Sequence, residues 1–239
     1  MNFGEFAKEL HIEGRVLSIK RMNDVMPENP ISSGCALRVL NHVMAGETVR
    51  LTLDSLSCNG GKSGFGFDDG LMKLPGGYGH FVSYGSDEEN APAGMRLKCD
   101  PELAERGALA APKGVMDGFS AIEIKPYEEG DEPDLVTVFA TPDQLAALNL
   151  LFGFRRIGDD LIFFPAGSGC YSIFRLPFAE LLKAQPRAVI GNADISSRVY
   201  FDANSLFFTV SGPAFRQMLE DSGESFLIAN AWKGIKKRL

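Results

Sequence analysis

The stretch Leu161–Cys170, LIFFPAGSGC, decides the fold that the sequence predicts, because the chain contains a second stretch of the same design. That counterpart is Val49–Cys58, VRLTLDSLSC. Each stretch begins with an apolar or alternating run typical of a β-strand and ends at a cysteine with glycines beside it. Two stretches of one design predict that a supersecondary unit occurs twice in the chain.

The residues downstream of the two cysteines support this duplication. A glycine follows each cysteine after 21 residues and a proline after 43, as Gly79 and Pro101 in one copy and Gly191 and Pro213 in the other. Each proline opens a helical pattern. Two copies of one unit bury their apolar faces by packing about a pseudo-twofold axis. We therefore expect two halves, 1–112 and 113–239, with a cleft between them.

Local signals predict the elements within these halves. The segment Thr141–Gln144 has a capping threonine, proline at the first helical position and glutamine three residues after the cap, which predicts a helix to about Phe152. A helix is also expected from Cys35 to Met44, after a cap at Ser32 or Ser33. Strands and helices mix without strict alternation, so the fold class is α+β, as one globular unit of two pseudo-symmetric mixed halves.

The composition narrows the class of protein. The net charge is −7, and no basic stripe or aromatic nucleic-acid motif occurs, which argues against a nucleic-acid partner. No apolar run reaches the roughly 18 residues of a membrane span, and the N-terminus has no signal-peptide pattern. Four cysteines in such a chain indicate reduced thiols and a cytoplasmic location.

Cys35 is the candidate catalytic residue. The repeat alignment places it in the first turn of its predicted helix, where free N–H groups and the helix dipole favour a thiolate. A low-pKa cysteine there could serve as nucleophile, redox thiol or metal ligand. The alternative is a small buried side chain that fills a gap.

Cys58 and Cys170 are candidate metal ligands together with Cys35. Glycines beside both let the backbone approach a ligand closely. Three thiolates suit an Fe–S cluster with one open iron, or zinc completed by His80 or water. The fourth cysteine, Cys99, is expected inside a core strand.

Polar residues near these positions are candidate ligand-binding groups for a small molecule or anion. They are His80, Asn192, Asp194, Arg198 and Lys62. Arg198 could hold a carboxylate or phosphate with two hydrogen bonds; the alternative is a turn whose polar side chains satisfy their own backbone. Lys62 lies in Asn59–Gly64, which lacks the first glycine of a P-loop and is expected to be an irregular loop over a site.

The chain resembles the uncharacterised ArCR family of archaea and bacteria, a domain of unknown function. The resemblance rests on Ile19-Lys20, on Cys35 before a helix, and on Leu56–Gly61. It continues through Pro133–Val136 with Gln144-Leu145, Ser168–Cys170, and Gly191–Asp194 with Arg198-Val199. It implies an intact domain over nearly the whole chain and implies no activity.

Three functions follow as alternatives. The first is binding of a small ligand, metal or Fe–S cluster near Cys35, Cys58 and Cys170. The second is a thiol-dependent enzyme in which Cys35 is the nucleophile and Cys58 the resolving thiol. The third is an interaction module without catalysis, in which the cysteines are structural.

Overall fold

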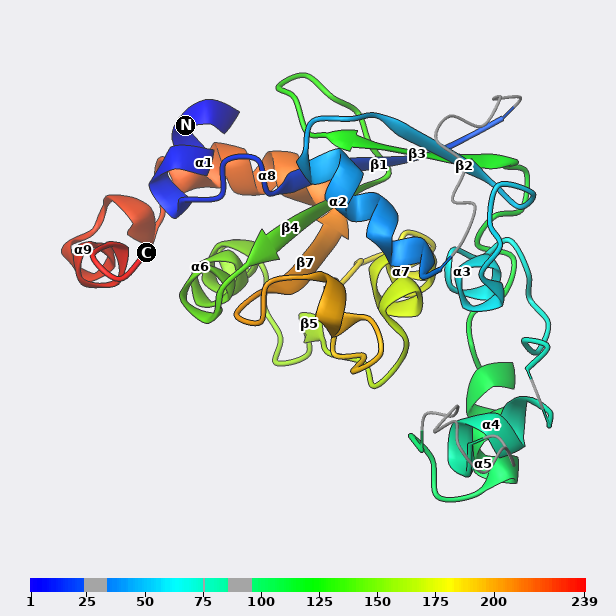
Figure 1. The fold of residues 1–239 in the computed structure, drawn as a ribbon. Helices are drawn as coiled ribbons and strands as arrows, with labels where there is room; N and C mark the ends of the chain where they lie inside the picture. Colours follow the sequence, from blue (N-terminus) through cyan, green and yellow to red (C-terminus); the bar gives the residue numbers. More distant parts are fainter. Residues whose placement is uncertain (24–33, 75, 86–95) are drawn as a thin grey trace.

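A mixed sheet of seven strands, in the order β2-β3-β1-β4-β7-β6-β5, runs through the protein. The computed structural model describes residues 1–23, 34–74, 76–85 and 96–239 (Figure 1). Neighbouring strands pair antiparallel, except that β5 and β6 are parallel. The strands are β1 (Val16–Met22), β2 (Val49–Thr52), β3 (Ala121–Pro126), β4 (Leu135–Ala140), β5 (Ile162–Phe163), β6 (Ala188–Gly191) and β7 (Leu206–Ser211).

Strand β4 is central because its sequence, LVTVFA, is apolar at nearly every position and can be covered on both faces. All six of its residues are buried between β1 and β7. The one polar side chain, Thr137, is satisfied within the sheet by a 2.9 Å hydrogen bond with Thr209 of β7. A continuous apolar run with its polar group paired is what a strand in the middle of a layered fold requires.

Each face of the sheet carries its own hydrophobic core, because successive side chains of a strand point to opposite faces. Leu135 and Phe139 of β4 belong to one core, and Val136 and Val138 to the other. The first core is covered by helical segments that follow Cys35 and Cys170, and the cysteines themselves lie in or against it. The second core is covered by helices from the two ends of the chain and from its middle.

The helical segments of the first layer are short. They are η1 (Ala36–Arg38), α2 (Val39–Met44), α3 (Asn59–Gly64), the single π-helical turn η2 (Tyr171–Arg175) and α7 (Leu176–Glu180). The other layer contains α1 (Phe3–Leu10), α6 (Pro142–Gly153), α8 (Gly212–Ser222), η4 (Phe226–Ile228) and α9 (Asn230–Lys236). Helix α6 begins at the predicted capping box, and Gln144 also donates from its amide to the Leu10 carbonyl at 2.9 Å.

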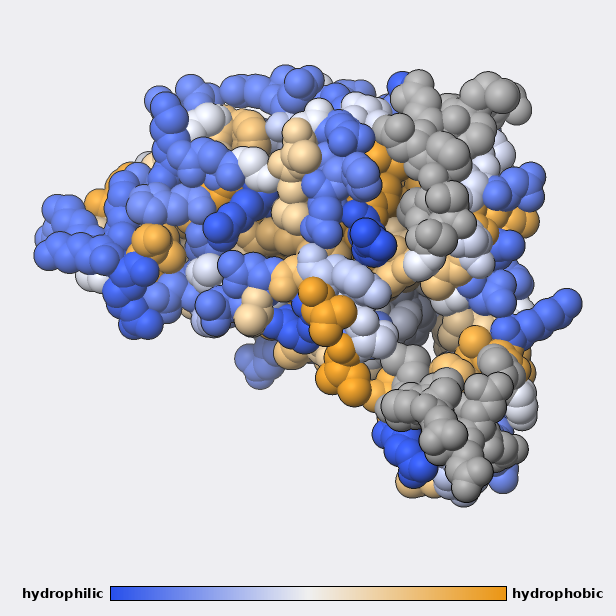
Figure 2. All heavy atoms as spheres, viewed as in Figure 1, coloured by the Kyte–Doolittle hydropathy of each residue, from blue (hydrophilic) through white to orange (hydrophobic). Residues whose placement is uncertain are grey.

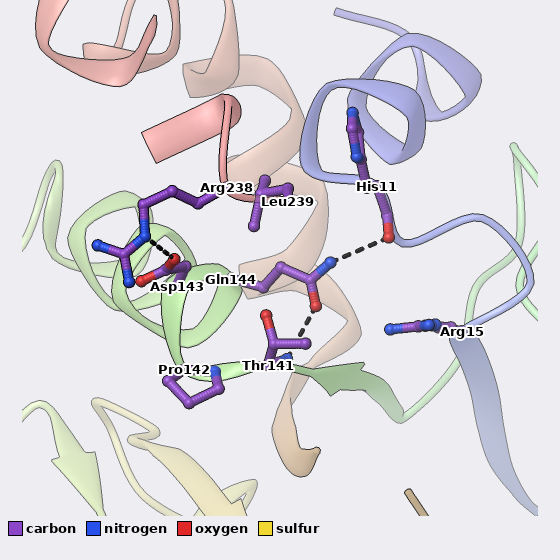
Figure 3. A pocket seen from close by; sticks show the side chains of 8 residues that line it. All are labelled: His11, Arg15, Thr141, Pro142, Asp143, Gln144, Arg238 and Leu239. Atoms are coloured by element: carbon purple, nitrogen blue, oxygen red, sulfur yellow. Dashed lines mark hydrogen bonds and ion pairs between the residues drawn. The ribbon is translucent and has the colours of Figure 1, made fainter. Parts of the chain in front are cut away.

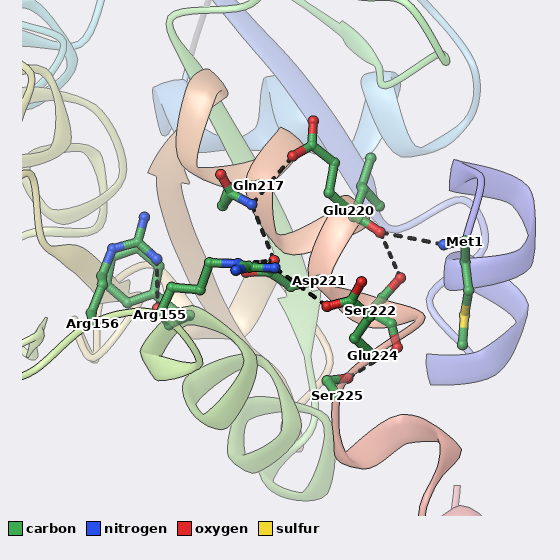
Figure 4. Close-up of polar contacts among 11 residues, drawn as sticks. Met1, Arg155, Arg156, Gln217, Glu220, Asp221, Ser222, Glu224 and Ser225 are labelled. Atoms are coloured by element: carbon green, nitrogen blue, oxygen red, sulfur yellow. Dashed lines mark hydrogen bonds and ion pairs between the residues drawn. The ribbon is translucent and has the colours of Figure 1, made fainter.

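Polar contacts join the end of α6 and the N-terminus to α8 (Figure 4). Arg155, just after α6, donates from Nε to buried Asp221 of α8 at 2.5 Å. Gln217 of α8 donates to the same carboxylate oxygen at 3.1 Å. The Met1 amino group donates to the Leu219 carbonyl at 3.4 Å. These bonds hold the N-terminus and the end of α6 against α8.

Helices α4 (Tyr78–Ser83) and α5 (Pro101–Leu109) form an arm that stands apart from the sheet and from both helical layers (Figure 1). They pack on each other, and Gly79 allows this, since a Cβ there would lie 2.6 Å from the Pro101 carbonyl oxygen. In Figure 2 hydrophilic residues cover much of the molecular face around α1 and α9, and apolar residues reach the surface in small patches.

The mixed α/β class and the single globular unit are confirmed, whereas an internal duplication is not shown by the described residues. Strand β3 comes from the second predicted half, 113–239, yet it pairs between β2 and β1 of the first, 1–112. Both predicted halves therefore contribute to one continuous sheet.

Several local predictions are wrong for physical reasons. Asn59–Gly64 is the helix α3 and not an irregular loop, because the Cys58 side chain caps it. Arg198–Tyr200 forms the 3-10 turn η3, which hydrogen bonds of the Arg198 side chain hold in place. Cys99 is exposed and precedes α5, whose cap is the next residue, so it lies in no core strand.

Other expectations fall outside the described residues or concern membranes. The cap expected at Ser32 or Ser33 lies outside the described ranges. Within those ranges, no helix combines the length and the apolar character that crossing a bilayer demands.

Candidate functional site

Three of the four cysteines lie at the start of a helical turn. Cys35 precedes η1, Cys58 precedes α3 and Cys170 precedes η2. The Cys58 sulfur accepts a hydrogen bond from the Gly61 N–H, with a nitrogen–sulfur distance of 3.3 Å. Within the described residues, the Cys35 side chain makes no capping hydrogen bond to η1. Cys58 and Cys170 each follow a short strand, because β2 ends shortly before Cys58 and β5 ends shortly before Cys170.

The three cysteine-bearing segments pack against one another at glycines. A Cβ at Gly61 would lie 2.6 Å from the Cβ of the first residue of η1, and one at Gly64 would lie 2.3 Å from the Cβ of Cys170. A Cβ at Gly169 would lie 2.3 Å from Leu37 Cδ1 in η1. None of the three glycines has a left-handed φ. Glycine is therefore needed here for close approach, and each segment touches the other two.

Burial raises the pKa of two of these thiols. Burial raises the pKa of Cys170 well above its ordinary value, and negative charge on Cys35, Cys58 and Asp194 raises it further. Burial also raises the pKa of Cys35, with the Leu37 N–H and Arg38 opposing and the charges of Cys58 and Asp194 adding to the rise. The expectation of a low pKa for Cys35 is therefore wrong, because desolvation outweighs the effects that lower this pKa.

The segment after β6 brings a buried carboxylate to the Cys170 end of η2. Asp194 is 7% exposed, and its Oδ2 accepts a hydrogen bond from the Gly169 N–H at 3.2 Å. Its other oxygen accepts from the N–H and the hydroxyl of Ser196, at 2.9 and 2.8 Å. The same carboxylate raises the pKa of both Cys35 and Cys170, so it lies within electrostatic reach of both thiols.

Asn192 and Arg198 build the turn that carries this aspartate. Arg198 donates from Nη1 to the carbonyls of Asn192 and Ser205, at 3.2 and 3.1 Å, and from Nη2 to that of Ala203 at 2.5 Å. These bonds occupy both terminal nitrogens of the guanidinium with the protein's own carbonyls. Anion binding by Arg198 stays a prediction. The three hydrogen bonds of Arg198 show that this side chain stabilises the turn.

The remaining candidate ligand-binding residues lie on other elements. Lys62 lies on α3, one turn after Cys58. His80 lies on α4 in the arm, where its ring stacks edge-on with Tyr84 at a centroid distance of 5.5 Å. The helices of the arm stand apart from the sheet (Figure 1), but Tyr78 at the start of α4 lies within electrostatic reach of Tyr171 in η2. Ligand binding by either side chain stays a prediction.

Arg175 positions the site, and our reading of the sequence did not identify it. Its side chain is 2% exposed, and it donates from Nη1 to the Ser63 and Asp68 carbonyls at 3.0 and 3.1 Å. It also donates from Nε to the Pro112 carbonyl at 2.6 Å and from Nη2 to Asp69 at 2.5 Å. Arg175 thus fastens the end of α3 to η2. The sequence feature that could have identified Arg175 is the presence of an arginine within the apolar run Ile173–Leu176.

Two surface hollows lie outside the cysteine-bearing segments. One, of about 420 Å³, is lined by Arg15, the start of α6 and the C-terminus (Figure 3). Its polar groups are largely engaged: Gln144 bonds the chain at Leu10 and His11, and Asp143 pairs with Arg238 at 3.0 Å. The other, of about 320 Å³, is lined by Arg198 and by Ala203–Leu206, among others. Neither hollow is lined by a cysteine.

The described part of the chain contains no group of three or more histidine, cysteine, aspartate or glutamate side chains arranged to hold a metal ion. It contains no disulfide either, since all four cysteines are free. A zinc site of three cysteines and His80 is therefore not preformed within these residues.

The comparisons with known proteins identify the family. The model of the family described as Uncharacterised ArCR, a domain of unknown function, matches residues 5–221, and the chain belongs to this family. No curated protein and no solved structure matches the chain. The match covers the whole sheet, the three cysteines before helical turns and the Asn192–Arg198 turn.

Proposed function

We propose that this member of the Uncharacterised ArCR family binds a thiophilic metal centre through Cys35, Cys58 and Cys170, with a position left open for a small molecule. One observation carries the proposal. The three segments that bear these cysteines touch one another at glycines that leave no room for a Cβ.

The electrostatics favour a cation at this place. If the thiols ionised without a cation, each negative charge would raise the cost of the next, and Asp194 would add to that cost. A bound metal ion removes this electrostatic cost, because a thiol that coordinates a metal is deprotonated outright. The raised pKa of Cys35 and Cys170 then predicts that metal uptake releases protons and strengthens as the pH rises.

The choice of metal follows from the ligands. Thiolates select zinc, Cu(I) and Fe–S clusters over hard cations such as magnesium. Sulfurs that share one zinc ion lie within about 4 Å of each other, given metal–sulfur bonds of about 2.3 Å. No such group is preformed in the described residues, so the cysteine side chains must turn inward on binding one ion. In an Fe–S cluster the ligating sulfurs are distributed over several irons, and three cysteines leave one iron open.

Thiol-enzyme chemistry has weaker support. A cysteine nucleophile reacts as the thiolate, and burial raises the pKa of Cys35. The third alternative, a module with purely structural cysteines, predicts that no metal binds.

The test is anaerobic metal uptake by the full chain and its single cysteine variants. Protein purified without oxygen is titrated with Cd²⁺, and separately reconstituted with iron and sulfide, and bound metal is measured per chain. Replacement of Cys35, Cys58 or Cys170 by serine should lower the Cd²⁺ affinity at least tenfold. Cys99→Ser is the matched control, because Cys99 is exposed and belongs to the arm, and it should leave uptake unchanged.

The outcomes separate the alternatives. Coloured protein holding iron and sulfide favours a cluster, and one Cd²⁺ without cluster assembly favours a single ion. Because Cys170 is buried, Cys170→Ala provides a second variant whose fold is checked by circular dichroism. Absence of uptake in wild-type protein, or equal uptake in all four variants, contradicts the proposal.

A further inference from the structure

Helix α6 carries apolar side chains on its outer face as well as on the face that packs on the sheet. The inner face, which includes Leu148 and Leu151, is buried in the second core. On the outer face Leu150 is 60% exposed, and Phe154, which caps the helix, is 43% exposed. Residues four positions apart share one face of a helix, so Leu150 and Phe154 form one outer strip. A helix that is apolar on both sides is typically covered on both sides.

The outer strip continues into the segment that follows α6. Among the described residues, Ile157 is the most exposed of the large apolar side chains, at 100%. A single exposed apolar residue is ordinary on a protein surface, whereas Leu150, Phe154 and Ile157 lie close together in the chain and on its outside. Grouped exposure of this kind marks an interaction surface.

The charges around Ile157 have opposite signs on its two sides. Two cations precede the isoleucine and two carboxylates follow the next glycine, in the order Arg155-Arg156-Ile157-Gly158-Asp159-Asp160. This order is complementary to itself when a second copy of the segment runs in the opposite direction, because each cation then faces a carboxylate. Arg156 would face the partner's Asp159, and Ile157 would face the partner's Gly158, which has no side chain to obstruct the approach.

The inner two charges of this segment are available for such pairing. Among the described residues, Arg156 and Asp159 form no ion pair. The Arg156 guanidinium donates from Nη1 to the Phe152 carbonyl at 2.5 Å and lies 4.0 Å from the centre of the Phe152 ring, which leaves its other N–H groups for a further acceptor. Burial lowers the pKa of Arg156 because the guanidinium loses hydration, and a carboxylate from a partner would offset that loss. Asp159 is exposed.

The two ends of the segment are held by the chain itself. Arg155 pairs with Asp221 and Glu224 at its start, as Figure 4 shows. At its other end the segment leads into β5, which pairs with β6. Ile157 is therefore presented by a segment that is anchored on both sides. A surface held in this way has less conformational entropy to lose when a partner binds.

We propose that the outer strip of α6 and segment 155–160 form the interface of a homodimer, in which two copies of the chain run in opposite directions about a twofold axis beside Ile157 and Gly158. Each Arg156 pairs with the partner's Asp159, and each Ile157 packs over the partner's Gly158. A second copy supplies both complementary charges at once, which favours it over an unrelated protein. This inference goes beyond the proposed metal binding and uses no cysteine.

The test is the oligomeric state of the full chain, measured by sedimentation velocity over a concentration series. Wild-type protein should form dimers. Ile157→Asp should raise the dimer dissociation constant by about tenfold or more, because it places a charge in the desolvated centre of the interface. Val199→Asp is the matched control, since Val199 is 77% exposed and lies on η3, and it should leave the dissociation constant unchanged.

A charge exchange tests the pairing itself and controls for folding. Arg156→Glu places two carboxylates opposite each other, and Asp159→Lys places two cations opposite each other, so each variant alone should dimerise more weakly than wild type. A mixture of the two variants should form a mixed dimer, because the new carboxylate of one faces the new cation of the other and the two unchanged residues face each other. A misfolded variant would not recover in this way.

Three results overturn the inference. The first is wild-type protein that stays monomeric throughout the series, which would leave the outer strip to a different protein. The second is a dimer that Ile157→Asp leaves as tight as wild type, and the third is a mixture of charge variants that dimerises no better than either alone. None of these results depends on Cd²⁺ uptake, so the proposed function is tested separately.

Discussion

Gly64→Ala tests whether α3 and the start of η2 are in contact. The added Cβ would lie 2.3 Å from the Cys170 Cβ and 3.0 Å from the Tyr171 backbone nitrogen, whereas ordinary contacts begin at 3.4 Å. The segments must separate by about 1 Å, which in a packed core costs about 1–3 kcal/mol. Alanine recovers up to about 1 kcal/mol as the better helix former. We therefore expect a net loss of about 1–2 kcal/mol in the free energy of unfolding.

The matched control for this substitution is Gly107→Ala in α5. A Cβ at Gly107 meets nothing within 4 Å, so the same change there should stabilise its helix by about 0.5–1 kcal/mol. Urea unfolding with an unchanged m-value measures both, and Cd²⁺ titration should show weaker binding only for Gly64→Ala. If Gly64→Ala is as stable as Gly107→Ala, the two segments do not pack as described and the reasoning fails.

Three further predictions concern single residues. Arg175→Met should lower the free energy of unfolding by about 1–3 kcal/mol in urea, because it leaves the part-buried carbonyls of Ser63 and Pro112 without their donor, whereas Arg106→Met on the exposed arm should change it by less than about 0.5 kcal/mol. Equal effects would refute the fastening role of Arg175. Burial acts to raise the pKa of Glu180, but hydrogen bonds from Arg187 and Lys183 lower this pKa overall. The ionised Glu180 therefore stabilises the fold above the pKa that it has in the unfolded chain, and this stabilisation is lost as the pH falls through its pKa in the folded protein. Glu180→Gln should therefore flatten the loss of stability below about pH 4.5 in acid titrations, and an unchanged slope would count against this. Iodoacetamide at neutral pH should modify exposed Cys99 before Cys35, whose pKa burial raises, as peptide mass spectrometry would show; preferential labelling of Cys35 would restore the thiol-enzyme alternative.

Elements with strong local signals were predictable from the sequence. The capping box at Thr141 and Gln144 starts α6 as expected, and the apolar run at Leu135–Phe139 forms β4. In these places capping chemistry and apolar pattern agree with the tertiary structure, so local reasoning suffices. The expectation of one globular unit of mixed α/β class followed from the same signals.

Features set by contacts between distant segments were not predictable in the same way. Segment Asn59–Gly64 lacks apolar residues at its start and is helical because Cys58 caps it and Arg175 holds its end. The glycines at 61 and 64 indicated loop flexibility, yet they serve close packing, which only the tertiary contacts reveal. The raised pKa of Cys35 likewise depends on burial by elements far along the chain.

X-ray absorption of the Cd²⁺-loaded chain measures the first neighbours of the bound metal and tests the central claim most directly. The account predicts three sulfur neighbours, with one lost in each of Cys35→Ser, Cys58→Ser and Cys170→Ser, and none lost in Cys99→Ser. A shell of oxygen and nitrogen alone, or a sulfur count that these substitutions leave unchanged, would contradict it.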